Sequence, residues 1–258
     1  MHTEMDVTKA ADRLAAAWRD GRRLDALPQG ERPGTLEQAY ALQARFVALT
    51  GAGTAGWKIA GASPRGLRED APTPPALGRL LKTSMYDSGA TLRLPAGATF
   101  TLEVEAAVVF ARDVAPAREA FDPATMIADA MVAVEVVCSR FVDRKAVGFP
   151  SFVADNAAFH AFVRGDALPG GAASAWLAAP AALYRDGVAV AAALTGDART
   201  DPLLALAHLW QVFAANGTAI AAGETVTTGT LTVPLDTDTP GEYEARLGEA
   251  SLRFTVSR

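Results

Sequence analysis

The sequence predicts an α+β protein in which a helical N-terminal region is followed by a β-rich body. Two observations support this prediction. Apolar residues recur at helical spacing over the first fifty positions, and they alternate or run together in short segments after about residue 90. We place a soft boundary near residue 80, so that residues 1–80 form a small N-terminal α/β region and residues 81–258 form a β-rich domain that carries the candidate site.

Two helices are predicted in the N-terminal region. Residues 6–19 carry apolar side chains at helical spacing. A second helix begins after Thr35, because residues 35–38 (Thr-Leu-Glu-Gln) have the form of a capping box, and Gly51 suits its end. A short strand over 56–60 follows, and it leads into a long loop rich in proline.

The β-rich body is predicted from four segments. Residues 99–110 alternate and then become wholly apolar, and residues 131–142 form a strongly apolar strand candidate. A further strand region spans 224–235, and the chain ends in a hairpin around Gly248-Glu249. Asp-Pro pairs at 122–123 and 201–202 each have the form of an N-cap followed by proline, so we expect a helix after each.

Composition excludes several classes of protein. With 24 basic and 29 acidic residues and a formal net charge of −5, the chain lacks the basic surface of a nucleic-acid binder. One cysteine, Cys138, can form neither an intrachain disulfide nor a thiolate zinc site. No apolar run approaches the roughly 20 residues of a membrane span, and the N-terminus lacks the apolar core of a signal peptide. We therefore expect a cytoplasmic protein without a membrane partner.

Three glutamates stand where solubility does not explain them. Glu103 and Glu105 lie two apart in a predicted strand, so their side chains share one face. Glu135 is the one acid in an apolar strand, where a carboxylate must be paired, protonated or bound to a metal. Since the three histidines (His2, His160 and His208) leave little for a histidine-rich centre, an all-oxygen site for Mg²⁺ or Mn²⁺ is one interpretation. The alternative is a solvated strand face, with Glu135 paired to Arg140 or another base.

Other polar residues are candidates for the same site. Lys58 lies in a mostly apolar strand and would serve as a base in a dry pocket, although a surface lysine on an edge strand is the alternative. Asp155-Asn156 is either an ordinary turn or a polar pair that points into a site. Thr228-Gly229-Thr230 offers hydroxyls and a close backbone that suit a substrate carboxylate, but the same residues also suit a twisted strand.

Five segments, taken in order, resemble one known family. They read WKI at 57–59, LEVE at 102–105, VEVVCSR at 134–140, VADNA at 153–157 and TGTL at 228–231. The series resembles the 2-keto-4-pentenoate hydratase and oxalocrotonate decarboxylase group of the fumarylacetoacetate hydrolase superfamily. The resemblance runs from about residue 36 to the C-terminus.

This resemblance implies a fold, a site and an activity. The fold would be a mixed β-roll or sandwich with flanking helices and a small N-terminal α/β region. Glu103, Glu105 and Glu135 match the ligands of Mg²⁺ or Mn²⁺, and Lys58 matches the active-site lysine. We expect a homo-oligomeric, metal-dependent hydratase that adds water to a 2-hydroxy-2,4-dienoate in aromatic catabolism. A decarboxylase of 4-oxalocrotonate-like acids and an acylpyruvate hydrolase are the alternatives within the family.

Two positions depart from the family pattern. Ala76 stands where the family usually has an aspartate, and Ala158 stands where a serine usually follows the Asp-Asn-Ala segment. Two polar groups of the usual site are therefore absent, which motivates a third alternative, a non-catalytic partner subunit. The three glutamates expected to bind the metal are all present.

Overall fold

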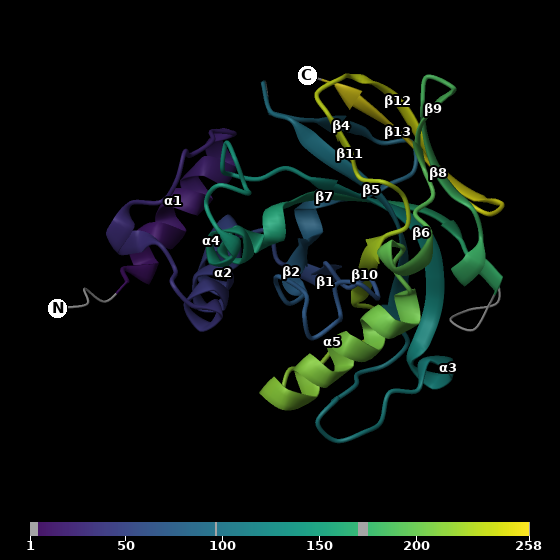
Figure 1. Cartoon of the computed structure of the whole chain (residues 1–258), viewed down its shortest axis with the longest axis horizontal. Coiled ribbons are helices and arrows are strands. Elements are labelled where there is room, and N and C mark those ends of the chain that lie inside the picture. The colour runs from purple at the N-terminus through teal and green to yellow at the C-terminus, as the bar shows by residue number, and fades with distance from the viewer. Residues whose placement is uncertain (1–4, 96, 170–174, 258) are drawn as a thin grey trace.

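The computed structural model describes residues 5–95, 97–169 and 175–257, and two β-sheets form the body of this part of the chain (Figure 1). The larger sheet has the strand order β2-β1-β10-β5-β6-β7-β3, with β11 paired to β5 outside this path, and the smaller sheet has the order β4-β13-β12-β8-β9. The strands are β1 (Thr54–Ala60), β2 (Ala76–Leu81), β3 (Met85–Asp87), β4 (Thr91–Arg93), β5 (Phe100–Phe110), β6 (Ile127–Val137), β7 (Phe159–Ala167), β8 (Ala181–Arg185), β9 (Val188–Ala192), β10 (Thr225–Thr230), β11 (Leu235–Thr237), β12 (Gly241–Leu247) and β13 (Ala250–Ser257).

The antiparallel pair β5 and β6 forms the centre of the larger sheet. From Ala130 onward on β6 and throughout β5, the even-numbered side chains, such as Val104 and Val134, are buried in the main core, which includes Tyr243 and Leu252 of the smaller sheet. Each valine, leucine or phenylalanine among them contributes roughly 1.5–3 kcal/mol through burial. Because a shift of one residue would turn these side chains out of the core, the register is strongly determined. The odd-numbered residues, which include all three glutamates, therefore lie on the opposite face.

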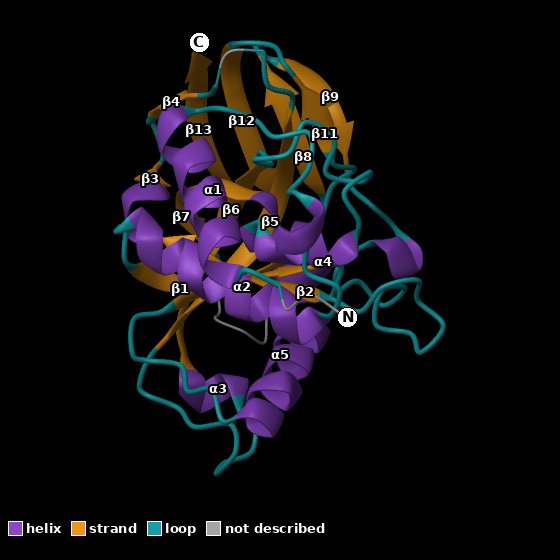
Figure 2. Cartoon of the chain, turned by 90° about the vertical axis from the view of Figure 1, so that its left-hand side faces the viewer, coloured by secondary structure: helices purple, strands orange, loops and turns teal. Residues whose placement is uncertain are grey.

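Three helices pack together beside the sheets (Figure 2). They are α1 (Val7–Asp20), α2 (Leu36–Thr50) and α4 (Phe149–Ala154). The Thr35 hydroxyl accepts a hydrogen bond from the Gln38 N–H at 3.2 Å, as predicted. The Gln38 side chain accepts instead from the Gly34 N–H, so the reciprocal half of the capping box does not form. Leu14, Phe46 and Val153 bury their side chains where these helices meet.

Helix α5 (Pro202–Asn216) crosses one side of the larger sheet and contacts β10. Asp201 caps it by accepting from the Leu203 N–H at 2.9 Å, and Gly217 ends it in the left-handed conformation, at φ 74°. The Asp122 cap also forms, but α3 (Pro123–Met126) is only one turn long because β6 begins directly after it. Short 3₁₀ turns connect other elements, including η3 (Asn156–Ala158) between α4 and β7.

Several boundaries differ from the predicted ones. The strand expected over 131–142 ends at Val137, because the residues that follow turn toward Asp155. The segment 224–235 divides into β10 and the start of β11, and a register irregularity separates Thr227 from Thr230. The proline-rich loop ends where β2 begins at Ala76 and pairs with β1. Strands β2, β7, β8 and β9 had no clear local signal.

The predicted fold class is confirmed, since the chain is an α+β protein with two curled sheets and flanking helices. The division of the chain near residue 80 stays a prediction. No helix within the described ranges is both long and apolar enough to cross a bilayer.

Candidate active site

Three glutamates from β5 and β6 meet on the odd-numbered face of the larger sheet. Glu103 and Glu105 lie two apart on β5, and Glu103 is directly opposite Glu135 in the antiparallel register. One carboxylate oxygen from each residue lies within 4.8 Å of the corresponding oxygens of the other two. The structure therefore brings together the three acids that the sequence singled out.

Burial raises the pKa of each of these acids. The pKa of Glu103 rises to about 7, because its carboxyl group is desolvated and lies near the charge of Glu135. Desolvation and the two neighbouring acids raise the pKa of Glu105 well above its usual range. Desolvation also raises the pKa of Glu135, although Lys58 opposes that shift. The cluster thus concentrates negative charge in a place with little water to screen it.

The donor set of this cluster suits a hard divalent cation. Carboxylate oxygens are the ligands that Mg²⁺ and Mn²⁺ prefer, and three of them leave positions open for water and substrate. Glu105 is held in place by β10, since it accepts hydrogen bonds from the Gly229 N–H at 2.8 Å and from the Thr227 hydroxyl. Such partners behind a ligand fix its orientation. A cation would also relieve the repulsion between the three carboxylates.

Lys58 lies fully buried beside the glutamates. Its Nζ contacts the Glu135 carboxylate and donates a hydrogen bond to the carbonyl oxygen of Ala157 at 2.9 Å. Gly78, its partner on β2, makes room for it, because a Cβ at that position would lie 2.9 Å from both Lys58 Cγ and the Asn156 carbonyl oxygen. The alternative of a surface lysine is wrong. It is also Lys58, not Arg140, that pairs with Glu135.

Asp155 is fully buried and engaged with other protein groups. Its carboxylate accepts hydrogen bonds from the Ser139 hydroxyl at 2.7 Å and the Arg140 N–H at 3.0 Å, and it forms an ion pair with the Arg140 guanidinium. Neither Asp155 nor Asn156 is among the residues that line the pocket described below. Their predicted contact with substrate stays a prediction.

Asn156 begins a left-handed turn next to Lys58. Asn156, Ala157 and Ala158 have φ angles of 54°, 48° and 60°, which residues other than glycine seldom adopt. The Asn156 side chain holds this turn against β2 by accepting from the Arg79 N–H at 2.7 Å and donating to the Arg79 carbonyl at 2.8 Å. The turn thereby delivers the Ala157 carbonyl to Lys58.

Thr228, Gly229 and Thr230 lie on β10, directly beside β5. The Thr228 hydroxyl donates to the Ala106 carbonyl at 2.9 Å, and the Thr230 hydroxyl donates to the Thr232 carbonyl at 2.8 Å. Gly229, at φ 110°, directs its N–H to Glu105. The structure thus places this segment behind the carboxylates, and its contact with a substrate carboxylate stays a prediction.

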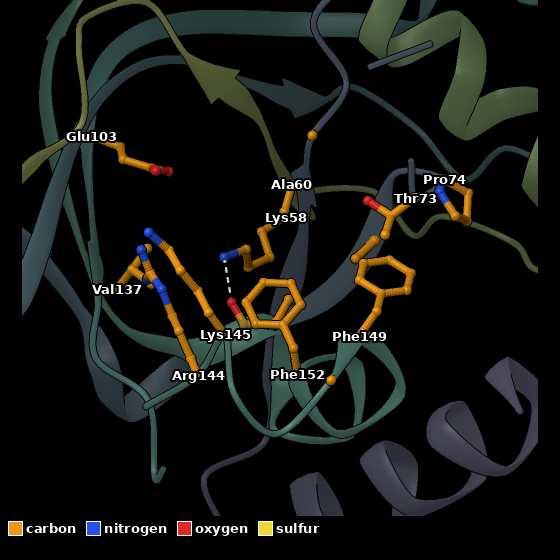
Figure 3. A pocket seen from close by; sticks show the side chains of 14 residues that line it. Lys58, Ala60, Thr73, Pro74, Glu103, Val137, Arg144, Lys145, Phe149 and Phe152 are labelled. Carbon is orange, nitrogen blue, oxygen red and sulfur yellow. Dashed lines mark hydrogen bonds between the residues drawn. The ribbon is translucent and has the colours of Figure 1, made fainter. Parts of the chain in front are cut away.

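A pocket of about 480 Å³ opens over Lys58 and Glu103 (Figure 3). Among the lining residues that were not singled out in the sequence are Arg144 and Lys145, from the loop after β6, and Phe149 and Phe152, from α4. No local pattern marks these residues, because their place in the pocket depends on how the 138–148 loop and α4 fold back over the sheet. The weak signals are the adjacent basic pair and the aromatic pair at helical spacing.

The alanines that depart from the family pattern lie close to the site. Ala76 is buried on β2 and lines the pocket, whereas Ala158 is buried in the left-handed turn, where its carbonyl accepts from the Cys138 N–H at 2.9 Å. Cys138 is buried, and burial raises the pKa of its thiol. His160 packs against Trp18 with ring centroids 5.5 Å apart, and His2 lies outside the described residues.

Comparison with known proteins supports the fold. No family model matches the chain. The chain is 29% identical over 262 residues to a 2-keto-4-pentenoate hydratase of Burkholderia vietnamiensis (strain G4), and the match covers all of both sequences. It superimposes on the 4-oxalocrotonate decarboxylase of Pseudomonas putida G7, complexed with magnesium and adipate, with a TM-score of 0.82 at 21% identity over 97% of each chain. A Yersinia pestis CO92 protein described as belonging to the fumarylacetoacetate hydrolase family gives a TM-score of 0.57 at 16% identity, over 78% of this chain and 91% of that one.

Proposed function

We propose that this member of the 2-keto-4-pentenoate hydratase and 4-oxalocrotonate decarboxylase group of the fumarylacetoacetate hydrolase superfamily is a metal-dependent hydro-lyase. It would add water to a 2-hydroxy-2,4-dienoate, or its 2-oxo-4-enoate tautomer, to give a 4-hydroxy-2-oxo acid. The observation that carries the proposal is the meeting of three carboxylates, two of them buried, with one buried lysine at a pocket. The similar hydratase, which matches over its whole length, supports the choice of reaction.

Glu103, Glu105 and Glu135 would hold the divalent cation, Mg²⁺ or Mn²⁺. When bound, such an ion supplies Lewis-acid stabilisation for negative charge that develops on a 2-oxo or 2-enol carboxylate. Glu103 is the ligand that also lines the pocket, whereas Glu105 and Glu135 lie deeper in the sheet.

Lys58 would move the proton. Its Nζ reaches the pocket while the Ala157 carbonyl and the Glu135 carboxylate hold it in place. A lysine fixed in this way can take the proton of the 2-enol and return a proton to the carbon chain. The apolar side chains of Phe149 and Phe152 would limit the access of bulk water to that exchange.

The same site would also support decarboxylation of a 4-oxalocrotonate-like acid or hydrolysis of an acylpyruvate. Ala76 and Ala158 supply no polar group, so a non-catalytic partner subunit is a further alternative. The expected homo-oligomer and the cytoplasmic location also stay predictions.

The test is turnover of 2-hydroxypenta-2,4-dienoate by the purified chain with Mg²⁺ or Mn²⁺. We expect loss of the dienol absorbance without release of CO₂, and no turnover in EDTA. Glu135→Gln should lower kcat/KM by at least about a hundredfold, since even residues behind metal ligands contribute 10- to 100-fold. Lys58→Ala should lower kcat with a smaller effect on KM, because it removes the proton carrier.

Glu249→Gln is the matched control, because Glu249 is exposed in the β12–β13 turn and distant in sequence from every site residue. It should keep full activity. Turnover that persists in EDTA would overturn the metal dependence. Release of CO₂ would select the decarboxylase. Failure to turn over this dienoate, a 4-oxalocrotonate-like acid and an acylpyruvate would select the partner subunit.

A further inference from the structure

The pocket has one charged end and one apolar end. Arg144 and Lys145 lie on the same side of it as Glu103, whereas Phe149, Thr73 and Pro74 lie on the opposite side (Figure 3). Apart from Lys58, Arg144 and Lys145, no cationic residue within the described ranges lines the pocket. The positive charge available to a ligand is therefore concentrated at the carboxylate cluster.

Arg144 is held at the charged end by β5. Its guanidinium donates to the Thr101 hydroxyl at 3.1 Å, and Thr101 lies two residues before Glu103 on the same face of the strand. The positive charge of Arg144 is close enough to oppose the upward shift of the Glu103 pKa. Asp236 lies 3.9 Å from the guanidinium but is mostly exposed, so it compensates that charge weakly.

The balance of charge at this end favours an anion. Lys58, Arg144 and Lys145 together match the three glutamates, so a bound divalent cation would leave two positive charges in excess. The charge of Lys145 lowers the pKa of the exposed Asp143, but Asp143 does not line the pocket. One carboxylate, together with the negative charge of an enolate, would neutralise this excess.

The other end offers mainly apolar contacts, since the hydroxyl of Thr73 is the one polar side-chain group among the described residues that line it. Phe149 and Phe152 lie three apart on α4, and their rings stack with centroids 6.2 Å apart. Ala60 and Ala76 form the adjoining wall from β1 and β2, and both are small enough to leave room between the sheet and the aromatic rings. A second carboxylate placed here would lose water and meet no cation, which is costly. A hydrocarbon or aromatic tail would gain contact area.

We infer that the substrate is a 2-oxo acid with a single carboxylate, held at the Arg144–Lys145 end, and an apolar tail that lies along Phe149 and Phe152. This inference rests on the proposed function and names its substrate class. The pocket volume of about 480 Å³ is in the range of sites for drug-sized ligands, so it has room for a tail longer than the two-carbon vinyl group of 2-oxopent-4-enoate. Arg144 and the two phenylalanines would then determine specificity.

The experiment is calorimetric binding of unreactive 2-oxo acids to the full chain with saturating Mg²⁺. 2-Oxohexanoate and 2-oxoadipate have the same chain length and differ in the second carboxylate, and 2-oxooctanoate extends the tail by two methylenes. We expect 2-oxohexanoate to bind at least tenfold more tightly than 2-oxoadipate. 2-Oxooctanoate should bind more tightly again, by up to about fourfold for each added methylene.

Two variants and a control test which end of the pocket binds the carboxylate and which end binds the tail. Phe149→Arg replaces a partly exposed side chain, so it should fold, and it should reduce or reverse the preference for the monocarboxylate. Arg144→Gln should weaken all three acids by a similar factor of about ten. Arg45→Gln, on the exposed face of α2, should change none of the affinities.

The outcomes separate this inference from the proposed function. Mg²⁺-dependent binding in which 2-oxoadipate equals or exceeds 2-oxohexanoate, or in which tail length has no effect, would overturn the inference and leave the proposed function standing. If none of the acids binds with Mg²⁺ or Mn²⁺, both are overturned.

Discussion

Two groups of buried charge lie close together in this fold and differ in how their charges are compensated. Asp155 and Arg140 form a pair in which the carboxylate accepts from Ser139 and from the Arg140 backbone, and the guanidinium also donates to the Phe159 carbonyl at 2.6 Å. The carboxylate cluster instead sets three acids against one contacting lysine. A pair whose donors and acceptors are all satisfied within the protein stabilises the fold. A cluster of three acids that share one contacting lysine is suited to receive a ligand.

Breaking the compensated pair should give the largest effect on stability. Asp155→Ala leaves the Arg140 guanidinium buried without its counterion, and we expect the free energy of unfolding to fall by about 3–5 kcal/mol. Urea unfolding measures this loss. Asp12→Ala, on the exposed face of α1, is the control and should change stability by less than about 0.5 kcal/mol. A loss below 1 kcal/mol for Asp155→Ala would show that the pair is not structural.

Binding of a divalent cation should stabilise the protein at the carboxylate cluster. Mg²⁺ at about a hundred times its dissociation constant should raise the free energy of unfolding by about 2.7 kcal/mol, since only the folded chain brings the three glutamates together. Thermal unfolding in Mg²⁺ and in EDTA measures the difference. The same ion should not stabilise Glu135→Gln. If Mg²⁺ stabilised the wild type and the variant equally, the metal would bind at a site other than the three glutamates.

Acid should lower the stability of the protein through His160, which lies near Arg140 of the Asp155–Arg140 pair. Burial, together with the charge of Arg140, lowers the pKa of His160 from 6.5 to about 4. The unfolded chain therefore takes up a proton near pH 6.5 while the folded chain does not, so this group's contribution to stability falls as pH falls through that window. We expect wild type to lose about 2 kcal/mol more than His160→Gln between pH 7 and pH 5, measured by urea unfolding. Parallel pH profiles would contradict this.

Removing one negative charge from the carboxylate cluster should have the smallest effect on the free energy of unfolding. Unlike the loss of Asp155, this change should stabilise the metal-free protein. In EDTA at pH 8, above the pKa of about 7 for Glu103, the Glu103→Gln variant should be more stable than wild type. We expect a gain of about 1 kcal/mol, roughly the equivalent of one pKa unit. Thermal unfolding checks the sign, and a loss of stability would mean that Lys58 and Arg144 already compensate the charge of Glu103.

Much of the fold follows from local sequence signals. Thr35, Asp122 and Asp201 cap the helices they were predicted to cap, because a cap depends on residues only two or three positions away. The pairing of Glu103 with Glu105 on one face is equally local, since it follows from the two-residue period of a strand. Strands such as β7 and β8 were not predicted, because their identity depends on partners distant in the sequence.

The sequence by itself determined which chemical groups are available: three glutamates at structured positions, one lysine in a mostly apolar strand, and a composition without thiolate or histidine-rich sites. Only the tertiary structure decided how they meet. It placed Glu135 opposite Glu103, and it joined Lys58 to the Ala157 carbonyl across 99 positions of sequence. It also paired Asp155 with Arg140, and it placed Arg144 over the pocket. The physical reason is that spacing along a strand is local, whereas register, loop closure and the compensation of buried charge depend on the packed core.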